Sequence, residues 1–268
     1  MVTKESFKKS KYSVEDLRDI VKILRAPGGC PWDAEQSHKS IRRDLLEEAY
    51  EVADAIDTDD DVALCEELGD LLLQVVFHSQ IATEEESFTL DEVADGICKK
   101  LILRHPHVFG DVIAETPEEV LNNWDAIKRD EKSQTTFTDT LQSVPRAFPA
   151  LMRAAKVQKR ASKAGFDWDN PEDAFKKLPE ELAEFSEAIK LDDKKNMEEE
   201  FGDLLFAAVN VSRFYKIDAE AALASATDKF MKRFELVEQE VLKSGRQMTD
   251  VSLEELDVIW NSIKRKCE

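Results

Sequence analysis

Two short segments of the chain are apolar at nearly every position, and each directly follows an acidic segment. They are residues 71–77 and 204–209. A helix that is apolar on all sides is buried, so we expect both segments in the core. Alternating apolar and polar positions, which are typical of β-strands, are rare elsewhere, and glycine supplies only 8 of 268 residues. The pattern therefore predicts helices and no sheet.

The same order of elements is predicted in both halves of the chain. A first helix ends near Ile56 or Lys190, a polar turn follows at 57–61 or 191–195, and a second helix contains the apolar run. Two further helices follow, and Pro179 fits an early position of the first helix in the second half. The expected fold class is all-α, with two tandem helical-bundle domains of four to five helices each.

An internal duplication underlies this order. The acidic motif at 47–51 (EEAYE) is followed, after fifteen residues, by ELGD at 67–70, and EELAE at 180–184 is followed at the same spacing by EFGD at 200–203. Basic and aromatic residues repeat as well: the pairs are Lys100 with Arg104 and Lys229 with Arg233, then Trp124 with Lys128 and Trp260 with Lys264. We expect domains at 1–132 and 141–268, joined by a polar linker at 133–140.

The repeated acids predict a metal site. Residues three apart share a helix face, so Glu48 points with Glu51, and Glu67 with Asp70. A short turn makes the two helices antiparallel neighbours, which can bring these faces together. Carboxylates on a helix that is otherwise core need a partner, and oxygen ligands without histidine or cysteine favour Mg²⁺. The competing interpretation is a solvated acidic face.

Glycine inside the second helix of each half supports the metal site. Gly69 and Gly202 lie between the acids of ELGD and EFGD, where each costs about 1 kcal/mol relative to alanine. The close approach of a neighbouring helix or of a ligand is the usual reason for such a glycine.

Phosphate chemistry is the leading function for such a site, because protein-bound Mg²⁺ commonly meets substrate phosphates. Lys229 and Arg233, together with Lys264 and Lys177, could neutralise phosphate oxygens. Trp260 or Trp168 could stack on a base or a ribose. Taken alone, such cations are most often surface charge, and a helical tryptophan is most often core.

Charge and composition exclude several other classes. The net charge of −20 removes the usual source of affinity for nucleic acid and for anionic membranes. The longest stretch without a charged residue, 71–83, has 13 residues, which is short of the about 20 that span a bilayer. No apolar segment follows the lysine-rich start, and the four cysteines have no CxxC spacing. We expect a soluble, reduced, cytoplasmic protein.

These motifs resemble the MazG nucleoside triphosphate pyrophosphohydrolases. Besides the repeated acids, the resemblance rests on GGCPWD at 28–33, RHPHVF at 104–109, GFDW at 165–168 and EFGDLLF at 200–206. It implies hydrolysis of nucleoside and deoxynucleoside triphosphates, ATP among them, to a monophosphate and pyrophosphate. It also implies Mg²⁺ as cofactor, with Mn²⁺ as a substitute, and a homodimer.

The resemblance also assigns roles to residues. The implied metal ligands are Glu181, Glu184, Glu200 and Asp203, with Glu48, Glu51, Glu67 and Asp70 in the first copy. The positions implied to face nucleotide and phosphates are Lys177, Glu199, Lys229, Arg233, Trp260 and Lys264. Metal-assisted attack of water on the α-phosphorus is the expected mechanism, in which Glu180 or Glu181 orients or deprotonates the water. Because Asp44 replaces Lys177 in the first copy, we expect the second copy to be the main catalytic one.

Two alternatives remain open at this point. One is a narrower pyrophosphatase acting on dUTP, dCTP or phosphoribosyl-ATP. The other is an acidic helical adaptor whose carboxylates bind a structural cation. The biological role is open between removal of non-standard nucleotides and control of nucleotides under stress.

Overall fold

The computed structural model describes residues 8–131 and 134–267, and within these ranges the chain forms helices and no β-strand. It divides into two compact units, Met1–Lys128 and Arg129–Glu268. The division lies inside α7, so each unit, counted over the described residues, has five helices of at least 12 residues, α7 being assigned to the first. The predicted all-α class with two helical domains is confirmed. No described helix combines the length and hydropathy needed to cross a bilayer.

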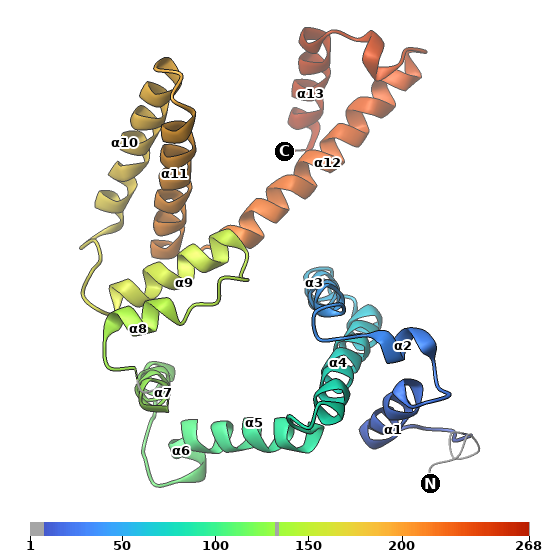
Figure 1. The fold of residues 1–268 in the computed structure, drawn as a ribbon. Helices are drawn as coiled ribbons and strands as arrows, with labels where there is room; N and C mark the ends of the chain where they lie inside the picture. The colour runs from blue at the N-terminus through green and yellow to red at the C-terminus, as the bar shows by residue number, and fades with distance from the viewer. Residues whose placement is uncertain (1–7, 132–133, 268) are drawn as a thin grey trace. The chain divides into compact units, whose positions relative to one another are not determined.

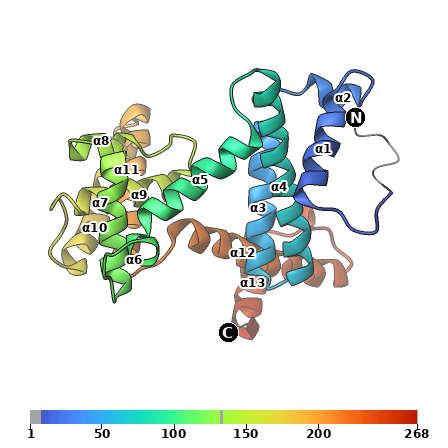
Figure 2. The same ribbon diagram turned by 90° about the horizontal axis from the view of Figure 1, so that it is seen from below.

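The first unit is built around a long helix hairpin. Its helices are α1 (Val14–Arg25), α2 (Pro31–Glu35), α3 (Arg42–Asp57), α4 (Asp61–Glu84), α5 (Leu90–Arg104), α6 (Pro106–Phe109) and α7 (Pro117–Glu131). Figure 2 shows α3 and α4 side by side, with α1 along α4. The buried core consists of Val21, Ile41, Val76, Phe77 and Ile81. The core thus joins α1 and the C-terminal half of α4.

Local signals set the ends of these helices. Asp60 caps α4 by accepting hydrogen bonds from the backbone N–H groups of Val62 and Ala63, both at 3.0 Å. Asp59 takes a left-handed conformation with φ of 53°, which lets the chain reverse between α3 and α4. The predicted polar turn at 57–61 is therefore confirmed, and α10 and α11 repeat it with Asp192 at φ of 52°.

Arg25 fastens α1 to the end of α4. Its side chain is only 5% exposed, and its guanidinium donates to the Glu84 carboxylate at 2.8 Å and to the carbonyls of Asp33 and Gln36 at 2.5 and 3.1 Å. Partial burial opposes ionisation of Glu84, but the bonds from Arg25 and Gln80 outweigh it and lower the pKa of this carboxyl. One side chain thus joins three segments of the first unit.

We expect Arg25→Met to lower the free energy of unfolding by about 2–3 kcal/mol, because hydrogen bonds to charged groups are lost and two half-buried carbonyls lose their donor. Lys22→Met, on the exposed side of the same helix, is the control and should change it by less than about 0.5 kcal/mol. Urea unfolding followed by circular dichroism measures both variants. Equal midpoints for the two would show that Arg25 does not hold α1.

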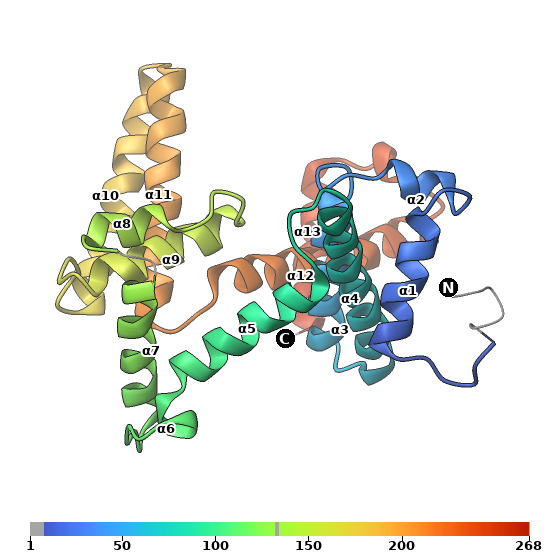
Figure 3. The ribbon, with the colours of Figure 1, turned by 60° about the horizontal axis from the view of Figure 1, so that its bottom comes forward.

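The second unit repeats the helix hairpin. Its helices are α8 (Phe137–Gln142), α9 (Ala150–Ser162), α10 (Pro171–Lys190), α11 (Lys194–Phe214), α12 (Ala219–Lys243) and α13 (Leu253–Cys267), with a 3-10 helix at Met248–Asp250. Figure 3 shows α10 and α11 side by side, and α9 packs against α11. Within this unit, the α10–α11 and α12–α13 pairs leave α9 in different directions (Figure 1). The unit therefore has two arms.

The segment expected to be a linker is partly helical. Thr136 caps α8 through a reciprocal pair of hydrogen bonds with Asp139, and Arg160 of α9 donates to the Thr140 carbonyl and, at 2.7 Å, to the Ser143 hydroxyl. The polar composition of 133–140 is typical of a linker, but its threonine and aspartate also form a helix N-cap. Residues 136–140 therefore belong to the second unit, whereas 132–133 lie outside the described residues.

The prediction of an early helical position for Pro179 is wrong. Helix α10 begins at Pro171, after Asn170, whose side chain accepts from the N–H of Asp173 at 2.9 Å. Pro179 therefore lies inside the helix, where it has no N–H to donate to the carbonyl of Phe175. The earlier cap of Asn170 and Pro171 sets the start of the helix.

The two apolar runs are buried on one side only. In α4, Val76 and Phe77 are buried, but Val75 is 37% exposed. In α11, Val209 is buried, whereas Phe206 is 45% exposed. The expectation that both runs are buried throughout is wrong, because the neighbouring helices of each unit cover only one side of the hairpin.

Candidate active site

The α10–α11 hairpin gathers three of the predicted acids of the second unit. Glu181 and Glu184 of α10 and Glu200 of α11 each offer a carboxylate oxygen, and these oxygens lie within 4.8 Å of one another. Glu181 is buried, with 8% of its surface exposed. The rings of Phe185 and Phe201, 5.4 Å apart, pack one residue further along each helix. The packing of the two helices thus places the three acids opposite one another across the hairpin.

The first unit contains the corresponding cluster. Glu48 of α3 and Glu67 and Asp70 of α4 bring their oxygens within the same 4.8 Å. Glu51 lies outside this set of three, but after desolvation it is among the causes that raise the pKa of Glu48 and Glu67. In the second unit Asp203 stands in the same relation to Glu200. Six of the eight predicted ligands therefore meet in two clusters, and the other two lie beside them.

The clusters hold negative charge that is compensated only in part, by Lys177 beside Glu181 in the second unit. Desolvation, followed by repulsion from Asp70 and Glu51, raises the pKa of Glu48. Desolvation is also the largest cause of the raised pKa of Glu67 and of Glu200, and repulsion from neighbouring acids adds to it. Glu199 is among the acids that act on Glu200. A donor set of carboxylate oxygens alone suits a hard divalent cation such as Mg²⁺. The residues present therefore fit the metal that the sequence predicts.

These raised pKa values predict a pH dependence. In the folded chain the three carboxyls hold protons at a higher pH than in the unfolded chain, so without metal the fold loses stability as pH rises from about 4.3 through the raised pKa. A bound cation would offset the repulsion between the carboxylates of each cluster. We expect Mg²⁺ to raise the melting temperature more at about pH 7.5 than at about pH 5.

Thermal unfolding in Mg²⁺ and in chelator at both pH values measures this difference. The control is the double variant Glu67→Gln/Glu200→Gln, which removes one carboxylate from each cluster and should reduce the Mg²⁺ effect at the higher pH. An equal gain at both pH values in the unsubstituted chain would contradict metal binding by these acids.

Lys177 lies within the acidic cluster of the second unit. Its ammonium is 2.8 Å from a carboxylate oxygen of Glu180 and 2.8 Å from one of Glu181, and these bonds raise the pKa of Lys177. The sequence predicts that Lys177 faces the phosphates of a substrate. In the structure it pairs with the two acids three and four residues further on. In the first unit the corresponding helix has Asp44 instead.

The remaining predicted residues lie on α12 and α13. The Arg233 guanidinium lies over the Trp260 ring, 6.0 Å from its centroid, and Phe230 contacts the same ring at 5.2 Å. In the first unit Arg104 lies over Trp124 at 5.2 Å. The members of both pairs are predicted from the sequence, but the contact between arginine and tryptophan is not. Their parallel repetition was the signal that could have shown it.

The structure does not bring the predicted residues into one site within a single chain. The acids and Lys177 lie on the α10–α11 arm, whereas the α12–α13 arm carries the cations and the tryptophan, namely Lys229, Arg233, Trp260 and Lys264. The two arms diverge from α9 (Figure 1). Lys229 and Lys264 are exposed. The unit thus separates an acidic half-site from a cationic and aromatic one.

The close helix approach expected at Gly69 and Gly202 is absent from the described residues. A Cβ atom built at either position would meet no atom within 4 Å beyond its own helix and neighbours. Packing within the described chain would therefore leave room for a larger residue, such as alanine, at both positions. Within each unit, the packing of a neighbouring described helix therefore does not account for these glycines.

Comparison with known proteins decides the family. The description of the MazG nucleotide pyrophosphohydrolase domain matches twice, at residues 36–109 and 169–237, and both matches include an acidic cluster. The chain belongs to the MazG family. It is a nucleotide pyrophosphohydrolase with two tandem MazG domains, so the predicted resemblance is confirmed.

Relatives of known name match the chain over most of its length. It is 44% identical over 250 residues to a nucleoside triphosphate pyrophosphohydrolase/pyrophosphatase MazG from Thermotoga maritima, covering 93% of this chain and 95% of the relative. It is 44% identical over 256 residues to the nucleoside triphosphate pyrophosphohydrolase of Escherichia coli K12, covering 94% and 97%. YabN of Bacillus subtilis is 48% identical over 252 residues, which cover 92% of this chain and 51% of YabN.

Proposed function

We propose that this MazG protein hydrolyses nucleoside triphosphates and deoxynucleoside triphosphates to the monophosphate and pyrophosphate at the acidic cluster of its second unit, with Mg²⁺ as cofactor. The observation that carries the proposal is the cluster of Glu181, Glu184 and Glu200, whose oxygens lie within 4.8 Å. Relatives covering nearly the whole chain are named nucleoside triphosphate pyrophosphohydrolases. We also propose that the enzyme works in the cytoplasm.

In this proposal the acids hold the metal and move one proton. Glu181, Glu184, Glu200 and Asp203 would hold Mg²⁺, which would neutralise phosphate charge and make the attacking water more acidic. Glu180, whose side chain is 54% exposed, or Glu181 accepts the proton of the water that attacks the α-phosphorus. The bond between that phosphorus and the bridging oxygen breaks, and pyrophosphate leaves.

The second unit is proposed as the main catalytic copy because of Lys177. In the structure Lys177 neutralises part of the charge of Glu180 and Glu181. As substrate phosphates approach, this ammonium can stabilise their charge as well, and an aspartate at the same place opposes it. Asp44 therefore makes the first copy the weaker catalyst.

We further propose a homodimer, in which the α12–α13 arm of a second copy brings its cations and tryptophan to the acids on the α10–α11 arm of the first. The α12 helix exposes large apolar side chains, with Phe230 at 55% and Met231 at 63%. The α10–α11 arm does the same with Leu182 at 52% and Phe201 at 47%. Exposed apolar surface of this kind marks interaction sites. The open space at Gly202 is then available to a neighbouring molecule.

The dimer predicts a particle of twice the chain mass of 30.5 kDa in sedimentation velocity at micromolar concentration. Met231→Glu, which introduces a charge into the exposed apolar surface of α12, should shift the particle toward the monomer. Val62→Glu, at an exposed position of the first unit (79%), is the matched control and should leave the mass unchanged. A monomeric mass together with full activity would overturn the homodimer.

A panel of nucleoside and deoxynucleoside triphosphates with identification of products tests the proposed reaction. Monophosphate plus pyrophosphate across several bases supports it. Activity confined to one nucleotide would replace the broad substrate range with a narrow one. Diphosphate plus phosphate would refute attack at the α-phosphorus.

A further inference from the structure

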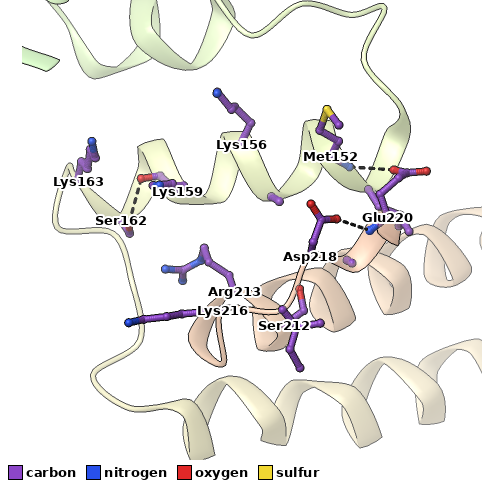
Figure 4. Close-up of a pocket in the computed structure, with 14 residues that line it drawn as sticks. Met152, Lys156, Lys159, Ser162, Lys163, Ser212, Arg213, Lys216, Asp218 and Glu220 are labelled. Carbon is purple, nitrogen blue, oxygen red and sulfur yellow. Dashed lines mark hydrogen bonds between the residues drawn. The ribbon is translucent and has the colours of Figure 1, made fainter. Parts of the chain in front are cut away.

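A second polar site lies at the other end of α11, away from the acids. A cavity of about 590 Å³ opens between α9, the C-terminal end of α11 and the start of α12 (Figure 4). Five cations line it: Lys156, Lys159, Lys163, Arg213 and Lys216. Gln158 of α9 donates to the Phe206 carbonyl of α11 at 2.8 Å and fixes these two walls together.

The cations of this cavity are only partly balanced. Lys156, Lys159 and Lys163 follow one another at spacings of three and four, which places them on one face of α9 and its last turn, where like charges repel. Among the described residues, the side chains of Lys156, Lys159 and Lys216 form no ion pair. In Figure 4 Lys156 points away from Arg213 and Lys216.

The acids of the cavity are already engaged. Asp218 caps α12 by accepting from the N–H groups of Glu220 and Ala221 at 2.9 and 3.1 Å. Glu220 accepts from the backbone N–H of Met152 at 3.1 Å. Arg213 is also occupied, because it donates to both oxygens of Asp167 at 2.9 and 2.5 Å. Lys156, Lys159 and Lys216 are therefore the groups left to meet a ligand.

The duplicated fold does not require these cations. Lys216 occupies the left-handed position after α11, with φ of 56°, and Glu86 occupies the same position after α4, with φ of 55°. In the first unit Glu84 and Glu85 precede it, so the corresponding turn is acidic. The basic cavity is thus a feature of the second unit, in a chain whose net charge is −20.

We propose that this cavity binds a nucleoside phosphate, with its phosphates among Lys159, Lys216 and the neighbouring cations. Lysine ammonium groups suit phosphate oxygens, and the volume is that of a small-ligand pocket. Leu151, Met152 and Ile217 offer an apolar wall for the base or sugar. The site is separate from the acidic cluster, since Glu200 and Arg213 are 13 residues apart, about 20 Å along α11.

Calorimetric titration of the full chain with ATP in excess chelator tests this site without hydrolysis. Without a cation, the acidic cluster repels ATP. Binding at the basic cavity can therefore be measured whether or not the chain hydrolyses triphosphates. We expect saturable binding that weakens at least about tenfold in Lys159→Ala/Lys216→Gly, a loss of about 1.4 kcal/mol. Lys190→Ala/Lys243→Ala, which removes two cations elsewhere in the same unit, should leave it unchanged.

Lys216→Gly alone separates a binding effect from a folding effect. Glycine adopts positive φ without strain, so this variant should melt no lower than the unsubstituted chain and still bind ATP more weakly. Unchanged ATP affinity in both lysine variants overturns the proposal. Pyrophosphate that binds as tightly as ATP also overturns it, because the apolar wall would then contribute nothing.

Discussion

Replacing Glu200 with glutamine is expected to lower kcat for triphosphate hydrolysis by about 10²–10³, the order of loss when one preorganised electrostatic contact of an active site is removed. Glu200 is the acid that α11 brings to the two acids of α10. Glutamine keeps the size of the side chain but cannot carry the negative charge that would hold the proposed cation. The matched variant Glu67→Gln in the first unit should keep most of the turnover, because that copy has Asp44 where the second has Lys177.

Steady-state kinetics at saturating Mg²⁺ measures both variants, and circular dichroism checks that both fold. The decisive quantity is the ratio of their kcat values. If Glu67→Gln abolishes turnover and Glu200→Gln leaves it intact, the assignment of the main catalytic copy is reversed and the role given to Asp44 is wrong.

Removal of divalent cations is expected to reduce hydrolysis to the level of the blank. The clusters offer carboxylate oxygens on rigid helices, a donor set that favours small octahedral ions such as Mg²⁺ or Mn²⁺ over Ca²⁺. Activity measured in excess chelator, and after addition of each ion in turn, tests this. Mg²⁺ and Mn²⁺ should restore turnover, whereas Ca²⁺ should restore little of it.

The control for this experiment is the melting temperature in chelator, which shows whether the fold survives without metal. Undiminished hydrolysis by folded chain in chelator would exclude a metal mechanism. Equal restoration by Ca²⁺ would contradict the selectivity argued from rigid helices.

The sequence predicts the acidic clusters well because their determinants are local. Glu181 and Glu184 are three residues apart on one helix, and a short turn with Asp192 at φ of 52° returns the chain so that Glu200 meets them. Helix spacing, caps and turns of this kind depend on near neighbours in sequence. Duplication doubles the signal, since Glu48 and Glu67 repeat the geometry.

Features that depend on distant segments were not predictable. Which side of α4 and α11 stays exposed depends on where the other helices pack, so the burial expected for Phe206 is wrong. The stacking of Arg233 on Trp260 joins residues of two helices. The basic cavity combines Lys159 with Lys216, 57 residues apart, and no pattern along the chain connects them.

Hydrolysis of a triphosphate in water enriched in ¹⁸O tests the central claim most directly. Attack of water on the α-phosphorus places the label in the monophosphate and leaves pyrophosphate unlabelled. We expect mass spectrometry to find one ¹⁸O atom per monophosphate formed by the unsubstituted chain, with formation slowed in Glu200→Gln. Label in pyrophosphate instead would show attack at the β-phosphorus and contradict the proposed reaction.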